Sequence, residues 1–183
     1  MPPTTPDNQT FLDLGAAEIT FKTDVLGKTS ANPNGGTHGG VGVSLSTPSA
    51  DVMRDALGAN IHDGVYTGLL LKLTANLTGL SINQFSKIIP GSSLVGGSNK
   101  GLLLSTPVGL TKRELAGLVT VKPIRRGVVS TNAAEWIRLF EAAPELNFDF
   151  QFDFEKQKVY AVTFTALVRA SDSALGCFGN NTT

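Results

Sequence analysis

Alternating acidic residues near the C-terminal end offer the closest approach to a catalytic pair. Asp149, Asp153 and Glu155 share one face of segment 148–155, and four phenylalanines occupy the other face. In a strand, residues i and i+2 lie roughly 7 Å apart and residues i and i+4 roughly 13 Å apart, and paired carboxylates at such separations can cleave glycosides. The unbroken phenylalanine face favours a simpler interpretation, in which the carboxylates form a solvated face opposite a hydrophobic core.

The segment Gly27-Lys28-Thr29 matches the end of a phosphate-binding loop. The full motif requires a glycine five positions before the Gly-Lys pair, where this chain has Lys22. The glycines of segment 35–40 also lack the G-x-G-x-x-G spacing of dinucleotide-binding proteins. We therefore predict no nucleotide cofactor, and we interpret Gly27 as a turn at the end of a strand.

The sequence also gives little support for a metal site or for a catalytic nucleophile. His38 and His62 are the only histidines and Cys177 is the only thiol, whereas metal sites need three or four ligands at close spacing. No serine stands in a G-x-S-x-G elbow, and Cys177 has no reactive context. The sequence predicts no catalytic, cofactor-binding or metal-binding residue, and thus a protein that is not an enzyme.

Composition narrows the class of partner. Charged residues make up 16% of the chain, below the roughly 25% of ordinary soluble domains. Such a low charge fits a surface covered by partners, and a surface rich in Gly, Ser, Thr and Asn would explain it equally well. Fifteen basic and fifteen acidic residues cancel, so no nucleic-acid footprint is visible. No apolar run reaches the roughly 20 residues of a membrane span and no signal peptide is recognisable, so we expect no membrane partner.

The elements that must carry these residues are mostly strands. Period-two alternation predicts strands, and segments 49–57 and 136–142 are compatible with either strand or helix. The predicted strands are 17–22, 41–45, 67–78, 118–122, 148–155 and 159–170.

One helix is predicted at Ser81–Ile89. Ser81 and Gln84 have the spacing of a capping box, and Leu80 and Phe85 stand where a hydrophobic staple would pack. Pro90-Gly91 ends the helix.

About seven or eight strands, one helix and no βαβ alternation predict a mainly β fold, an antiparallel β-sandwich or barrel with one flanking α-helix. We expect a flexible N-terminal leader at 1–10, a single domain at 11–179 and a C-terminal tail at 180–183. A long Gly-rich loop at 27–40 and a second Gly/Ser loop at 91–100 are expected within the domain.

Several short segments, in order, resemble the tail tube proteins of long-tailed bacteriophages, which are related in fold to the inner tubes of contractile injection systems. The resemblance covers nearly the whole chain and depends on the order and spacing of the segments. They are Leu14–Phe21, Leu26–Thr29, Gly39–Val43, Arg54–Gly58, Thr67-Gly68, Leu80–Gly91, Phe140–Pro144, Tyr160–Leu167 and Phe178-Gly179.

The resemblance implies a virion structural protein that self-assembles as stacked hexameric rings into a hollow tail tube, the conduit for DNA ejection. It implies that Asp149, Gln151, Asp153 and Glu155 face the lumen, where DNA would pass without specific binding; the alternative lumen face is Leu70, Lys72, Thr74 and Asn76. It also implies that the Gly-rich loop contacts neighbouring subunits, through Lys28, Asn32, Asn34, Gly36 and His38.

The partners implied are further copies of the chain, the tail tip or baseplate, the tape measure protein and the tail terminator. The location implied is the virion tail, after synthesis in the host bacterial cytoplasm. Alternatives are another virion β-sandwich, such as a tail terminator or capsid decoration protein, or a carbohydrate-binding module.

Overall fold

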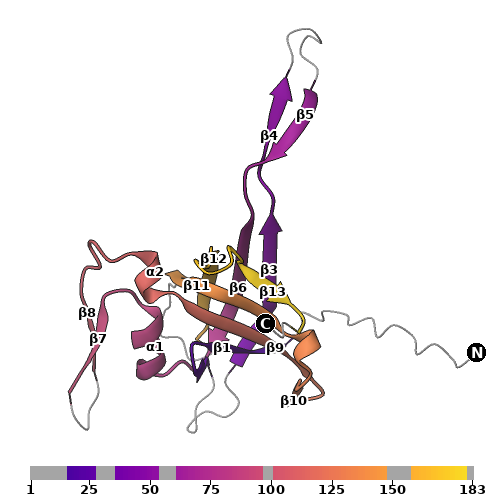
Figure 1. The fold of residues 1–183 in the computed structure, drawn as a ribbon. Helices are drawn as coiled ribbons and strands as arrows, with labels where there is room; N and C mark the ends of the chain where they lie inside the picture. Colours follow the sequence, from indigo (N-terminus) through magenta and orange to yellow (C-terminus); the bar gives the residue numbers. More distant parts are fainter. Residues whose placement is uncertain (1–15, 28–35, 54–60, 97–100, 148–157, 181–183) are drawn as a thin grey trace, which may run out of the picture.

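The computed structural model describes residues 16–27, 36–53, 61–96, 101–147 and 158–180. Across these ranges the protein is mainly β, every strand pair is antiparallel, and two α-helices are present. The longer helix, α1, lies beside the sheet (Figure 1). The predicted fold class, an antiparallel β architecture with one flanking helix, is confirmed.

A nine-stranded sheet forms the body, with strand order β2-β1-β9-β11-β12-β6-β3. Two short strands lie off this path, because β10 pairs with β9 and β13 pairs with β11. The strands are β1 Ala17–Phe21, β2 Asp24–Val25, β3 Gly36–Ser46, β6 Leu70–Thr78, β9 Gly117–Arg125, β10 Val128–Val129, β11 Ile137–Asn147, β12 Tyr160–Leu167 and β13 Gly176–Phe178.

The sheet curls until its two ends meet. The hydroxyl of Thr37, on β3 at one end, accepts a hydrogen bond from the Ala17 amide at 3.2 Å and donates one to the Ala17 carbonyl at 3.1 Å. Gly27 follows β2 with φ +73°, and a Cβ there would lie 2.7 Å from the Thr78 carbonyl oxygen. The predicted turn role of Gly27 is thus confirmed, and the close approach leaves no room for a side chain.

The core fills the concave side of this curled sheet. Alternate residues of each strand are buried, as period two requires. Phe21 and Phe164 lie at its centre with ring centroids 5.4 Å apart. Alternation along β6 buries Leu71, Leu73, Ala75 and Leu77, whereas Leu69, which precedes β6, is 50% exposed.

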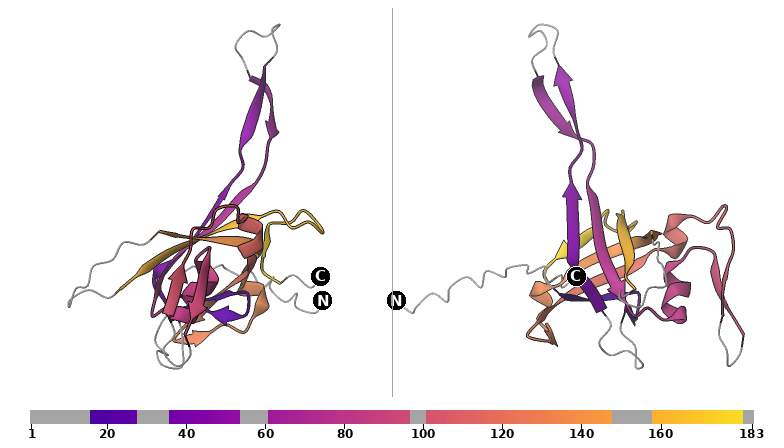
Figure 2. Two further views of the ribbon diagram at one scale, coloured as in Figure 1. Left: turned by 90° about the vertical axis from the view of Figure 1, so that its left-hand side faces the viewer. Right: turned by 180° about the vertical axis from the view of Figure 1, so that it is seen from behind.

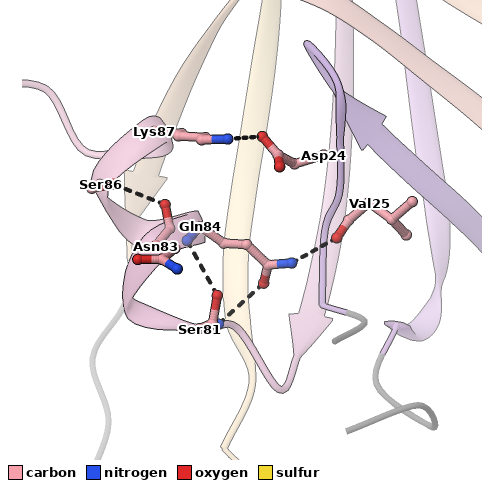
Figure 3. A network of polar contacts seen from close by, with 7 residues as sticks. All are labelled: Asp24, Val25, Ser81, Asn83, Gln84, Ser86 and Lys87. Carbon is pink, nitrogen blue, oxygen red and sulfur yellow. Dashed lines mark hydrogen bonds and ion pairs between the residues drawn. The ribbon is translucent and has the colours of Figure 1, made fainter. Parts of the chain in front are cut away.

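Helix α1, Ile82–Ile88, is held to the sheet by its own cap (Figure 3). The Ser81 hydroxyl accepts a hydrogen bond from the backbone N–H of Gln84. The Gln84 side-chain oxygen accepts one from the backbone N–H of Ser81 at 3.1 Å, so the predicted capping box is confirmed. The Gln84 side-chain nitrogen also donates to the Val25 carbonyl at 2.6 Å. Lys87 forms an ion pair with Asp24, which ties the last turn of the helix to β2.

Two further hairpins leave the body. β4, Ser49–Met53, pairs with β5, Ile61–Tyr66, and β7, Ser92–Val95, pairs with β8, Gly101–Leu104. Figures 1 and 2 show both as projections from the curled sheet, β4–β5 beyond the ends of β3 and β6 and β7–β8 beside α1. A short helix α2, Lys112–Leu115, and a 3-10 turn η2, Ala133–Glu135, complete the described elements.

Several boundaries differ from those predicted. Residues 36–40 were expected in the Gly-rich loop, but they begin β3, with a register shift between Thr37 and Val41. The predicted loop at 91–100 contains β7, because its serines pair with the leucines of β8. The ambiguous segments 49–57 and 136–142 contribute strands β4 and β11. The phenylalanine segment 148–155, the leader 1–10 and most of the tail lie outside the described residues.

Candidate assembly surfaces

The β4–β5 hairpin and the residues that join it to the body, 47–69 overall, form a segment that we call the arm. At its base, the Thr67 amide and the Thr67 hydroxyl both donate hydrogen bonds to the Pro48 carbonyl, at 2.8 and 3.0 Å. In the described part of the arm, every residue whose burial is known is exposed. Residues 47–52 and 63–69 of the arm therefore bury no side chain against the described body.

Large hydrophobic side chains are exposed along the arm and at its root. They are Leu45, Val52, Val65, Tyr66, Leu69 and Leu70, with exposed fractions from 40% to 77%. Ala50 pairs with Val65 and Val52 pairs with Asp63, so alternation places all four on one face of the hairpin. That face is apolar apart from the Asp63 carboxylate. The described strands of the arm carry Asp51 and Asp63 and no lysine or arginine.

A second apolar surface lies at the base of the β7–β8 hairpin. An open pocket of about 470 Å³ is enclosed by this hairpin, α2 and β11. Ion pairs of Lys112 with Glu145 and of Arg113 with Glu141 hold α2 on β11 beside it. Six of its apolar lining residues are Ile89, Leu104, Pro107, Leu110, Leu115 and Leu146.

A second open pocket, of about 500 Å³, lies at the root of the arm, where Leu45 and Leu69 face Val168 and Phe178. Each projecting hairpin thus has an open apolar hollow at its base. Contiguous apolar surface of this kind is a common mark of protein interfaces.

The convex face of the sheet carries short polar side chains. One cross-strand row runs from Gly42 through Thr74 and Thr163 to Glu145. The next row runs from Ser44 through Lys72 and Thr165 to Ala143. The alternative lumen residues Leu70, Lys72, Thr74 and Asn76 therefore lie on one face of β6, opposite its buried residues.

The turn between β9 and β10 forms a basic corner, made of Arg125, Arg126 and the neighbouring strand residues Lys122 and Arg138. Arg126 and Gly127 form a two-residue turn with φ +51° and +79°. Type I′ turns require positive φ at both positions and favour Asn or Gly, so an arginine costs on the order of 1 kcal/mol there. Trp136 lies between Lys122 and Arg138, whose charged groups are 4.9 and 5.0 Å from its ring centroid.

Carboxylates offset half of the charge at this basic corner. Glu135 lies 3.3 Å from Arg125, and Glu18 lies 3.8 Å from Lys122. Arg126 forms no ion pair with any residue that the structure describes. The corner is therefore net positive, with Arg126 as its accessible charge.

Three described side chains, Asp172, Arg169 and Cys177, have shifted pKa values with clear structural causes. The hydrogen bond from Arg169 lowers the pKa of Asp172 to about 2, with help from the Ala174 amide. The same contact raises the pKa of Arg169, and burial raises the pKa of the Cys177 thiol. A thiol that burial keeps protonated is a poor nucleophile.

Two negative findings concern the described part of the chain alone. Nowhere in it do three or more His, Cys, Asp or Glu side chains gather closely enough to hold a metal ion. Among the helices found there, none is both long and apolar enough to cross a membrane.

The predicted site residues are only partly within the described ranges. Asp149, Gln151, Asp153 and Glu155 lie outside them, as do Lys28, Asn32 and Asn34. Gly36 and His38 lie on β3 rather than in a loop, and His38 is exposed at the register shift.

The arm is the surface that sequence reasoning missed. The run Leu69-Leu70-Leu71 was its signal, because it places leucines on both faces of a strand that has one face in the core.

No protein-family model matches this chain, and no curated protein is significantly similar to it.

Proposed function

We propose that this chain is a virion structural protein that self-assembles as stacked hexameric rings into the tail tube of a long-tailed bacteriophage, the conduit for DNA ejection. The observation that carries the proposal is the arm, a long hairpin with an apolar face that packs on no other part of the chain that the structure describes. The segment-by-segment resemblance to tail tube proteins supports the ring and tube geometry.

Ordering the arm has a cost in free energy. An isolated two-stranded hairpin is marginal in water, and ordering each residue costs about 1–2 kcal/mol. Fully burying one Val or Leu side chain gains about 1.5–3 kcal/mol. Docking the exposed arm side chains on another copy would therefore offset this cost, and a tube of stacked copies would repeat the gain at every subunit.

The open edge of the sheet at β3 also favours assembly with further copies. β3 ends the strand order of the body, so one edge of it is open apart from the contact of Thr37 with Ala17. Open edges invite pairing with another chain. A ring in which each β3 meets a neighbouring subunit would cover this edge and extend the sheet around a pore.

The convex face then supplies a lumen wall that DNA does not bind. Basic side chains hold DNA by releasing counterions from its phosphates. In the two rows described above, Ala143 is buried, and Glu145 forms an ion pair with Lys112 of α2. Lys72 is then the one charge of these rows that is not already paired with a described residue. Such a wall is close to neutral and would let DNA slide. Segment 148–155, with Asp149 and Asp153, was the first prediction for the lumen and lies outside the described residues, so the proposal uses the alternative face of β6.

The remaining partners follow from the tube. Its ends would bind the tail tip or baseplate and the tail terminator, its interior would hold the tape measure protein, and its location would be the virion tail.

Electron microscopy of the purified chain, concentrated alone, tests the proposal, together with sedimentation over a range of concentrations. Tubes or stacked six-fold rings are expected. Isolated rings or trimers that never stack would favour a tail terminator or capsid decoration protein. A chain that stays monomeric at every concentration would contradict self-assembly.

A further inference from the structure

We propose that the apolar face of the arm, with Asp63, docks on the basic corner of the next copy along the tube, where Asp63 pairs with Arg126. The inference rests on the proposed function and names the surface that joins one ring to the next. It assigns the occupant of both surfaces as a second copy of this chain.

The two surfaces lie at opposite ends of the molecule. The arm leaves the body at one end, and the β9–β10 turn lies at the other end (Figures 1 and 2). Copies stacked in one orientation would bring the arm of each copy to the basic corner of the next. A contact between two different patches does not close on itself in this direction, so the stack grows without limit.

Charge and apolar surface match on the two sides. Asp63 shares its face with Val52 and Val65, which are 41% and 54% exposed. On the corner, Arg126 is followed two residues later by Val128, which is 69% exposed. The arm face thus offers one carboxylate beside apolar side chains, and the corner offers a net positive charge beside Val128.

Both charges are unpaired with the rest of the described chain. Asp63 accepts a hydrogen bond from the Gly64 amide at 2.7 Å but joins no ion pair there, and neither does Arg126. An ion pair between copies would use charges that the isolated body leaves in water.

The backbone at Arg126 supplies an independent observation. Its φ of +51° belongs to a turn position where Asn or Gly would be less strained, and the turn itself has no use for a guanidinium. Strained non-glycine residues tend to persist where their side chain has a function. The structure therefore carries a side chain at this turn that the fold of one copy does not require.

Charge exchange tests the pairing. We expect Asp63→Lys and Arg126→Glu each to raise the protein concentration needed for tube formation by about tenfold or more, because like charges would then face each other. These variants should accumulate as separate rings. The double variant should assemble within about threefold of the wild type, because the opposite pair is restored with its ends exchanged.

Asp51→Lys is the matched control. Asp51 lies on the same hairpin but on the face opposite Asp63, since it pairs with Gly64. It makes the same charge change, and we expect less than about a threefold effect.

Arg126→Gly separates assembly from folding. Glycine relieves the positive φ, so the thermal midpoint of the unassembled chain should rise or stay unchanged, while tube formation weakens. The midpoint is measured in the Asp63→Lys background, where the chain remains unstacked.

The outcomes are distinct. Wild-type tubes together with single variants that stack normally, or a double variant that does not recover, would overturn the pairing and leave the tube function standing. A wild-type chain that never forms rings or tubes would remove the function and the pairing together.

Discussion

The hydroxyl of Thr37 contacts both backbone groups of Ala17 and so joins the two ends of the curled sheet. Thr37→Val keeps the shape of the side chain but removes both hydrogen bonds. Because the partly buried backbone groups of Ala17 lose their partner, we expect the free energy of unfolding to fall by about 1–3 kcal/mol. Urea denaturation measures the change. Thr74→Val, on the exposed convex face, is the control and should change stability by less than about 0.5 kcal/mol.

Gln84 should be more important to stability than a surface helix residue. Its side chain satisfies the Ser81 amide and the Val25 carbonyl, and it is buried. Gln84→Ala removes both bonds, and we expect a loss of about 2–3 kcal/mol. Gln84→Glu keeps the acceptor for Ser81 but places a carboxylate against the Val25 carbonyl, so it should not restore stability. Equal stability of wild type and Gln84→Glu in denaturant would refute this account.

Gly27 should tolerate no side chain. An added Cβ would lie 2.7 Å from the Thr78 carbonyl oxygen, at a φ that L residues rarely adopt. We expect Gly27→Ala to cost about 2–4 kcal/mol, from the left-handed backbone and the overlap together. Gly39 has a similar φ of +76° but open space around it, so Gly39→Ala should cost about 1 kcal/mol. A comparison of thermal midpoints separates the steric contribution from the conformational one.

The turn that joins β12 to β13 should respond to acid. The hydrogen bond from Arg169 lowers the pKa of Asp172 from 3.8 to about 2, so the unfolded chain binds this proton first as pH falls. The contribution of Asp172 to stability is present above about pH 4 and is lost between about pH 4 and pH 2. The difference in free energy of unfolding between wild type and Asp172→Asn should therefore shrink as pH falls through that window. Unfolding at several pH values measures it. A titration of the carboxyl carbon by NMR with a midpoint near 3.8 would contradict this.

Removal of the arm should separate folding from assembly. Residues 49–66 are replaced by Asn-Gly, which suits a two-residue turn between Pro48 and Thr67, already joined by a backbone hydrogen bond. Because the described arm residues are exposed, we expect the body to unfold within a few degrees of its normal midpoint. Tubes should not form in sedimentation or electron microscopy, whereas separate rings should remain, because the arm joins one ring to the next. Normal tubes from the shortened chain would show that the arm has no part in assembly.

Local signals predicted the fold class and the helix well. Ser81 and Gln84 lie three residues apart, and their capping box depends on nothing distant in the chain. The alternation of β1 and β12 likewise reports burial directly, because one face of each strand meets the core.

The arm and the extent of β3 were harder to predict for a physical reason. Glycine favours turns, yet Gly36 pairs with Thr78 of β6, and Gly39 and Gly40, with positive φ, lie in a register shift within β3. The arm has no core to impose a pattern, so the sequence left 49–57 undecided between strand and helix and predicted no element at 61–66. Assembly surfaces follow the shape of a partner, and the alternation within one chain does not record that shape.

The pairing of β1 with β9 sets the order in which the molecule can form. Ile19 pairs with Val121, roughly one hundred residues further along the chain, whereas the arm closes between neighbouring strands. On the ribosome, the first strand must wait until most of the polypeptide has emerged, while the sticky hairpin is complete early. A cell that makes many copies at once would thus hold chains whose arm is formed before the body has folded. Prolonged synthesis would then favour aggregation of these chains over assembly of folded copies.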